Sequence, residues 1–197
     1  MEHFAAGKFS GQMLQTMEFD GVMTSETEYD YEFVDWHCHD NPYFSLTMVG
    51  SCRETNRRGV LESSPDALIF HHSHEPHCNT KTCGVSRGFQ VEVSHDWCRR
   101  FDVDLGIMPP SSKLADPSIK LHFYNIYKEA RSADDMSCMT ISSLLLQAFN
   151  AMQSHLAQAH EQRQGLKQQQ QQLESVLLAC RTALDEATLE IKRKGED

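Results

Sequence analysis

Histidines are concentrated in two short stretches of this 197-residue chain. His37 and His39 flank a single cysteine in the first stretch. The second stretch contributes His71, His72, His74 and His77. On an extended strand, residues i and i+2 point to the same face and lie about 7 Å apart, so the first pair projects together. A third imidazole from a neighbouring strand would complete one side of a metal site or a set of polar anchors for a ligand.

Neutral imidazole binds zinc, copper, iron and nickel, so a divalent transition metal is the cofactor that a three-histidine cluster would hold. Cys38 is a poor further ligand, because alternation along a strand turns its side chain away from both neighbours. Glu75 and Glu92 are the candidate bases, although lone carboxylates in turns or at strand ends are more often solvated or ion-paired. A metal centre and a polar ligand site are both consistent with this pattern.

The segments that must position these side chains read as short strands separated by turns, up to about residue 92. Pro42 precedes the segment 43–49, which is rich in β-forming residues and is followed by Gly50. Alternation gives this strand an apolar face and a mixed face. The apolar face holds Phe44, Leu46 and Met48, and the mixed face holds Tyr43, Ser45 and Thr47. One face can pack into a core while the other stays available to a polar ligand.

Helical spacing replaces this pattern in the second half of the chain. We predict a barrel or sandwich of short strands over 1–101, a connector over 102–118, a helical dimerisation or packing region over 119–162, and a Gln-rich spacer with a C-terminal helix over 163–197. An apolar stripe between 135 and 160 needs a partner surface, and Gly165 is a candidate helix break. A coiled-coil-like seam follows the glutamine run, made by Leu173, Val176, Leu177, Cys180 and Leu184.

Charge and cysteine content restrict the partners and the compartment. The formal net charge of -10 repels phosphate backbones. Arg53 and its basic neighbours lie next to Glu54 and Glu62, which predicts an ordinary solvated surface rather than a basic patch. Seven scattered cysteines without a C-x-x-C pair indicate a reduced, cytoplasmic protein. No stretch approaches the ~18 apolar residues of a membrane helix, so no membrane partner is expected.

Several of these segments occur in the order found in a known family. They are WHCHDNPYFSLTMVG at 36–50, Arg53-Glu54, PDALIFH at 65–71, and Glu75-Pro76-His77. The segment from Phe33 to Trp97 resembles the N-terminal cupin-like, arabinose-binding-like sensing domain of AraC-type transcription regulators. The resemblance implies an α+β fold, with a cupin or jelly-roll-like β-barrel followed by C-terminal helices. It also implies a small-molecule effector bound in the barrel, with His37, His39, Tyr43 and His77 as anchors, and a homodimer formed through the C-terminal helices.

Two departures from the family pattern affect the functional interpretation. Metal-using cupins have a glutamate where this chain has Tyr43, which leaves His37, His39 and His77 as a three-histidine metal set completed by solvent or substrate. The DNA-binding half, two helix-turn-helix units of on the order of 100 residues, is absent from this chain. We therefore expect a non-enzymatic sensor that does not bind DNA directly. The alternative is a stand-alone metal-dependent cupin enzyme, dioxygenase-like or isomerase-like.

Overall fold

A computed structural model describes residues 1–82 and 84–194, with the side chains of 189, 190 and 192–194 left aside. Cys83 and the last three residues of the predicted 163–197 region therefore lie outside the described part. The chain divides into two compact units, Met1–Gln153 and Ser154–Asp197. The first unit contains the candidate site and all strands found among the described residues.

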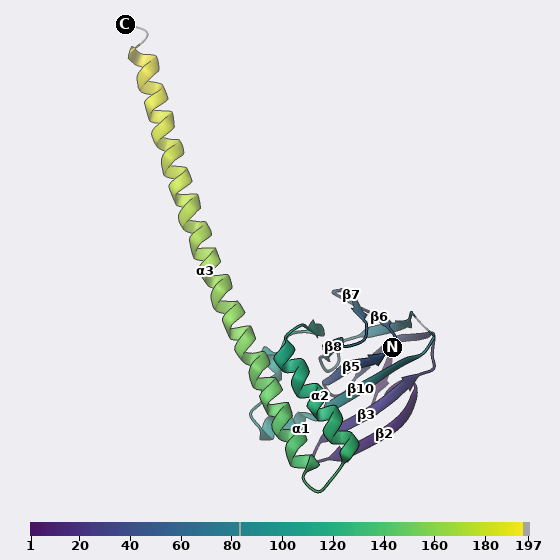
Figure 1. The fold of residues 1–197 in the computed structure, drawn as a ribbon. Helices are drawn as coiled ribbons and strands as arrows, with labels where there is room; N and C mark the ends of the chain where they lie inside the picture. The colour runs from purple at the N-terminus through teal and green to yellow at the C-terminus, as the bar shows by residue number, and fades with distance from the viewer. Residues whose placement is uncertain (83, 195–197) are drawn as a thin grey trace. The chain divides into compact units, whose positions relative to one another are not determined.

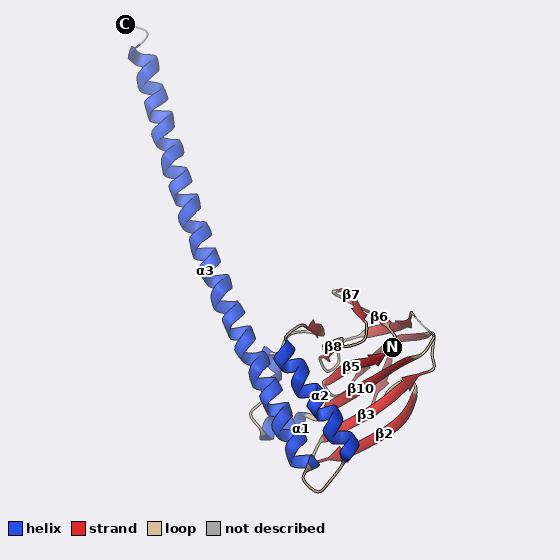
Figure 2. Ribbon diagram, in the orientation of Figure 1, coloured by secondary structure: helices blue, strands red, loops and turns tan. Residues whose placement is uncertain are grey.

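Eleven strands lie between residues 2 and 114 of the described chain. Figures 1 and 2 show how they are arranged. They are β1 (Glu2–Phe4), β2 (Gln12–Phe19), β3 (Val22–Tyr29), β4 (Phe33–His39), β5 (Tyr43–Val49), β6 (Cys52–Asn56), β7 (Gly59–Ser63), β8 (Leu68–His71), β9 (His77–Lys81), β10 (Ser86–Val93) and β11 (Ser112–Leu114). Their hydrogen-bonded order is β1-β4-β9-β6-β7 in one sheet and β11-β8-β5-β10-β3-β2 in the other.

The strand pairing defines a jelly roll. Within the run of strands from β3 to β10, the first strand pairs antiparallel with the last, the second with the second-last, and so on. The pairs are β3 with β10, β4 with β9, β5 with β8 and β6 with β7. Additional pairs join β5 to β10 and β6 to β9, which winds this long hairpin into two sheets. Jelly rolls of this kind are the architecture of cupins, and the expected mainly-β first half followed by helices is confirmed.

Local sequence accounts for several of the element boundaries. Asp20-Gly21 joins β2 to β3, and both residues have positive φ (48° and 85°), as a two-residue hairpin turn requires. The Ser94 hydroxyl accepts a hydrogen bond from the Trp97 amide and caps α1 (His95–Arg100). Asp116 caps α2 (Pro117–Ser132) in the same way, with a proline at the first helical position.

The helices cover one sheet of the first unit. Figure 1 shows α2 and the first part of α3 (Ser137–Lys194) against the sheet that contains β5, β10 and β3. The core between them includes Phe44, whose ring centroid lies 4.4 Å from that of Phe123 and 5.4 Å from that of Phe149. Trp97, Leu145 and Phe149 are fully buried in the same cluster.

This packing corrects the prediction for the apolar stripe between 135 and 160. The stripe does need a partner surface, but the partner is the chain's own sheet. Ile141, Leu145 and Phe149 have no exposed surface. They are therefore not available to a second copy.

Two further local expectations differ from the structure. The connector expected over 102–118 contains a 3-10 helix (η1, Leu105–Ile107) and strand β11, which pairs with β8. The helix break expected at Gly165 is wrong, since α3 is helical on both sides of that residue. A glycine inside a helix costs only about 1 kcal/mol relative to alanine, which a helix of this length tolerates. Among the described residues, none of the helices combines the length and apolar character needed to cross a lipid bilayer.

Candidate ligand and metal site in the jelly roll

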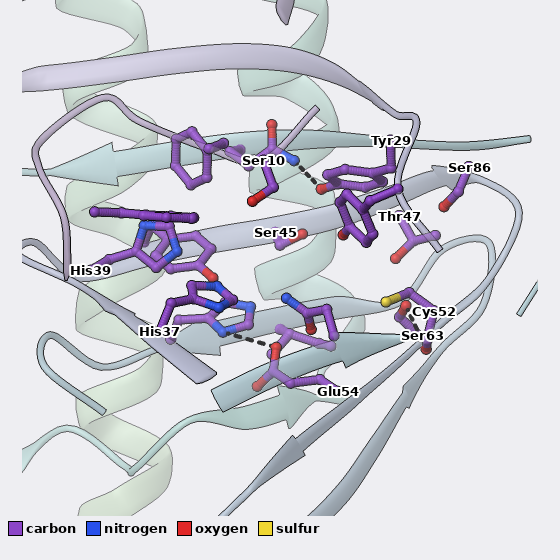
Figure 3. A pocket seen from close by; sticks show the side chains of 18 residues that line it. Ser10, Tyr29, His37, His39, Ser45, Thr47, Cys52, Glu54, Ser63 and Ser86 are labelled. Atoms are coloured by element: carbon purple, nitrogen blue, oxygen red, sulfur yellow. Dashed lines mark hydrogen bonds and ion pairs between the residues drawn. The ribbon is translucent and has the colours of Figure 1, made fainter. Parts of the chain in front are cut away.

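A cavity of about 60 Å³ lies between the two sheets, and polar side chains from both sheets line it (Figure 3). Strand β5 illustrates how the sequence produces this lining. Tyr43, Ser45 and Thr47 face the cavity, while Phe44 and Leu46 are buried in the core on the helix side. The predicted division of β5 into a packing face and a polar face is confirmed.

Three histidines meet beside one end of this cavity: His37 and His39 line it, and His77 lies next to them without lining it. His37 and His39 lie at the end of β4, and His77 begins β9 directly opposite His37 in the ladder. The ring centroid of His77 is 4.3 Å from that of His37 and 5.6 Å from that of His39. One ring nitrogen of each lies within 4.8 Å of the others. The structure thus brings together the three residues that the sequence singled out for a metal.

Backbone carbonyls fix the orientation of two of these rings. His37 Nδ1 lies 2.7 Å from the Asp35 carbonyl oxygen, and His77 Nδ1 lies 3.1 Å from that of Glu75. A carbonyl only accepts, so each Nδ1 carries the proton and each Nε2 keeps a free lone pair. Metal-binding histidines are usually oriented in this way. His39 Nδ1 is buried and has no hydrogen-bond partner, so the donor set fits a transition metal.

Burial keeps the three imidazoles neutral at pH 7. Burial is the main reason that the pKa of His39 falls to about 2, and repulsion of a positive charge by the neighbouring His77 and His37 contributes to the same shift. The pKa of His77 falls to about 4, again mainly through burial, and that of His37 is also lowered. Neutral imidazole is the form that binds metal ions.

Tyr43 connects the triad to a second buried group. Its hydroxyl lies 3.4 Å from His77 Nε2, and its ring stacks on His71 at a centroid distance of 4.1 Å. His71 Nδ1 in turn lies 3.4 Å from Glu54 Oε2. Burial lowers the pKa of His71 and raises the pKa of Glu54 to about 8, so at pH 7 this contact joins two neutral groups.

The position of Glu54 contradicts the sequence-based expectation of a solvated surface. Glu54 is 5 % exposed and lines the cavity, whereas the neighbouring Arg53 forms an exposed ion pair with Glu62 (2.9 Å). Alternation within β6 explains the difference, because residue 54 and residue 53 point to opposite faces. The same alternation, applied to 52–56, would have indicated that Glu54 shares a face with Asn56.

Gln90 on β10 organises the polar far side of the cavity. Its carbonyl oxygen accepts hydrogen bonds from the hydroxyls of Ser25 and Thr27, both at 3.0 Å, and its amide donates to the Tyr29 hydroxyl. Gly88 leaves room for this contact, since a Cβ at that position would lie 2.6 Å from the Tyr29 hydroxyl. No sequence motif pointed to this group of residues.

The N-terminal segment covers the histidine end of the cavity. Phe4 stacks on His37 at 4.7 Å, and Phe9 contacts the rings of His39 and Tyr43, each at 5.2 Å. The Gly7 amide donates to both carboxylate oxygens of Glu92, at 3.1 and 3.0 Å.

Neither carboxylate suggested as a base from the sequence lines the cavity. Glu92 also accepts a hydrogen bond from the Asn41 amide at 2.8 Å, so it anchors the N-terminal segment. Glu75 accepts one from the Ser111 amide (2.7 Å) and lies 3.3 Å from the Arg58 guanidinium. The carboxylate that does line the cavity is Glu54.

Fold and site together define a jelly-roll protein with a buried cluster of three histidines beside a buried glutamate.

No protein-family profile matches the chain, and no curated protein matches it. Solved structures with a similar arrangement include a cupin-2 domain protein from Shewanella frigidimarina, with 12 % identity over 43 % of this chain and 84 % of that one, at a TM-score of 0.37. A cupin superfamily protein from Desulfitobacterium hafniense has 19 % sequence identity, and the match covers 44 % of this chain and 81 % of that protein, at a TM-score of 0.36. A DMSP lyase from Ruegeria pomeroyi has 13 % sequence identity, and the match covers 39 % of this chain and 40 % of the lyase, at a TM-score of 0.36.

Proposed function

We propose that this chain is the ligand-sensing module of an AraC-type regulator, which binds a small polar effector inside the jelly roll. The observation that carries the proposal is a set of buried polar atoms without a protein partner. His39 Nδ1, Glu54 Oε1 and Ser86 Oγ are such atoms, and all three residues line the same cavity. Leaving a buried polar group unpaired costs about 1–3 kcal/mol, so their concentration at one cavity favours a bound polar ligand.

The strand that lines the cavity also connects it to the helices. Tyr43 faces His71 and His77 on the inside, while the next residue, Phe44, contacts Phe123 and Phe149 on the outside. A ligand that shifts Tyr43 therefore acts on a strand packed directly against α2 and α3. This arrangement suits a sensor whose output is a change in helix packing.

The effector's anchor at the histidine end is a divalent transition metal held by His37, His39 and His77. The carbonyl-fixed Nδ1 protons of His37 and His77 support this assignment, since they leave the lone pair of each Nε2 as the acceptor for a ligand, with the Tyr43 hydroxyl 3.4 Å from that of His77. When bound, such an ion would supply Lewis acidity toward an effector oxygen or a water molecule. The protein's own contribution is to keep the three rings neutral and converging, with Phe4 and Phe9 excluding bulk water.

A metal-dependent cupin enzyme is the second candidate, and the position of Glu54 favours it. One carboxylate oxygen of Glu54 lies within 4.8 Å of ligand nitrogens of His71 and His77. A carboxyl group that holds its proton at neutral pH beside a metal site could serve as a general acid. The sensor remains our conclusion, because the same residue equally suits hydrogen bonding to an effector.

Elemental analysis and native mass spectrometry of the purified chain test this function. We expect about one zinc, iron, copper or nickel ion bound at the triad, lost in His37→Ala and retained in the control His122→Ala, which alters a histidine on α2. A small-molecule adduct that is lost together with the metal supports the sensor, and turnover of a metal-bound compound supports the enzyme. A chain without metal or adduct, and unchanged in thermal stability by added Zn²⁺, contradicts both.

A further inference from the structure

A second cluster of metal-ligating side chains lies on the opposite face of β4 from the histidine triad. Cys38 alternates with His37 and His39, so its side chain points away from the cavity, as the sequence predicted. Strand β1 runs parallel to β4 with His3 paired to Cys38. Phe4 contacts the triad on one face of β1, which leaves His3 on the other face beside the thiol.

The turn between β8 and β9 brings a third donor to this cluster. The His74 amide donates to the His39 carbonyl oxygen at 2.9 Å, which fixes the turn against the end of β4. His74 has a φ of 59°, a left-handed conformation that a non-glycine residue seldom adopts. This conformation places an imidazole nitrogen of His74 within 4.8 Å of both Cys38 Sγ and a ring nitrogen of His3.

The separation of Cys38 and His3 fits a tetrahedral ion. With Zn–S near 2.3 Å and Zn–N near 2.0–2.1 Å, two tetrahedral ligands of these kinds are separated by about 3.5 Å. Cys38 Sγ lies 3.4 Å from His3 Nδ1, so this pair is already at the required separation. Both His3 and His74 are exposed and can rotate, whereas the cysteine is buried at 1 % exposure. Only the two flexible partners need to adjust.

We propose that Cys38, His3 and His74 form a zinc site that is separate from the cavity, with solvent as the fourth ligand. One thiolate and two imidazoles are a donor set that zinc accepts in proteins. The ion would join the N-terminal strand and the 72–76 turn to β4, the strand that also carries His37 and His39. The inference does not depend on the proposed function, because it uses none of the cavity residues.

Cobalt titration of the reduced, metal-free full chain tests the site. Co²⁺ replaces Zn²⁺ in such sites and gives a thiolate-to-cobalt charge-transfer band in the near ultraviolet, which a cluster of histidines alone does not produce. We expect the wild-type chain to develop this band, and excess Zn²⁺ to abolish it. Cys38→Ser should remove the band, whereas the matched control Cys138→Ser, at an exposed thiol on α3, should leave it intact.

Two further variants separate this site from the triad and from misfolding. His74→Ala, at an exposed position, should weaken cobalt binding at the thiolate site by more than about tenfold. Loss of a residue that only supports a metal ligand commonly costs about 10–100-fold in affinity, so loss of a ligand should cost at least as much. His37→Ala should keep the thiolate band while losing any ion held in the cavity. A wild-type chain without the band, or a band that survives Cys38→Ser, would overturn the proposal.

Discussion

Individual side chains in and next to the cavity differ in whether their polar atoms have hydrogen-bond partners, and this difference identifies the binding surface. The Ser25 hydroxyl donates to Gln90, whereas the equally buried Ser86 hydroxyl has no partner. Folded proteins rarely leave such atoms unpaired unless a ligand or another polar partner uses them. Functional sites commonly reduce stability in this way.

Matched serine substitutions test this interpretation. Ser86→Ala removes an unpaired hydroxyl, so the free energy of unfolding should stay the same or rise by up to about 1 kcal/mol. Ser25→Ala removes one of two donors to Gln90 and should lower it by about 1 kcal/mol. Urea denaturation of the metal-free chain measures both values. A loss of stability in Ser86→Ala equal to that in Ser25→Ala would show that Ser86 has a structural partner.

The neutral histidines also predict a pH dependence. The folded-state pKa values of His39 and His77, about 2 and about 4, lie below the unfolded value near 6.5. The unfolded chain therefore binds more protons between pH 6.5 and 4, so stability is present above pH 6.5 and is lost as the pH falls. Each proton contributes a slope of about 1.4 kcal/mol per pH unit.

Denaturation midpoints of the metal-free chain at pH 7, 6 and 5 check this dependence. His39→Gln should reduce the slope because it removes one titrating group, while His122→Gln on α2 should leave it unchanged. Glu54 changes the stability in the opposite direction. Its folded-state pKa of about 8 is higher than the unfolded value near 4.5, so the folded chain binds the extra proton between these values and the stability falls as the pH rises above about 4.5. Stability that does not change between pH 6.5 and 5 in all three proteins would contradict the assignment of neutral imidazoles.

Secondary-structure elements determine how the site is covered. Strand β1 has only three residues and pairs with a single neighbour, β4. The segment that follows is held mainly by the Gly7–Glu92 hydrogen bonds and by the contacts of Phe9. A cover with so few contacts should open locally without unfolding the jelly roll.

Replacing Phe4 tests this cover. Phe4→Ala removes the ring that stacks on His37, so the amides of residues 2–9 should exchange hydrogen at least about tenfold faster, as expected for a loss of roughly 1.4 kcal/mol in local stability. The amides of β5 and β10 should keep their protection. Leu14→Ala, at a half-exposed position on β2, is the control. Faster exchange throughout both sheets would show that Phe4 supports the whole fold rather than the cover.

The whole molecule presents a helix surface that its own fold leaves uncovered. In the second unit, Leu173, Leu177 and Leu184 are 64–68 % exposed and recur at intervals of four and seven residues, as in a coiled-coil seam. The predicted homodimer therefore has a candidate surface in this part of α3, in place of the stripe that is buried around Leu145. A second copy of the chain fits such a seam because two identical helices bury the same residues symmetrically.

A pair of glutamate substitutions tests the dimer. Leu177→Glu lies on the seam and should shift the protein from dimer to monomer in sedimentation equilibrium, because two charges would face each other at the interface. Leu178→Glu is equally exposed but lies off the seam, so it should remain dimeric. Leu145→Glu, by contrast, should prevent folding, since it buries a charge in the core. A wild-type chain that is monomeric at high concentration excludes the interface.

The sequence by itself determined the mainly-β half, the helical half, the polar face of β5 and the pairing of His37 with His39, because these depend on alternation and helical spacing along the chain. The jelly roll was implied by the family resemblance and not by periodicity. Only the tertiary structure decided which residues from distant segments meet. It brought Glu54 into the cavity, buried the stripe around Leu145 against the sheet, and placed His3 and His74 beside Cys38. Local periodicity specifies which face of an element a side chain occupies, but the partner across that face depends on strand order and register, which no short stretch of sequence contains.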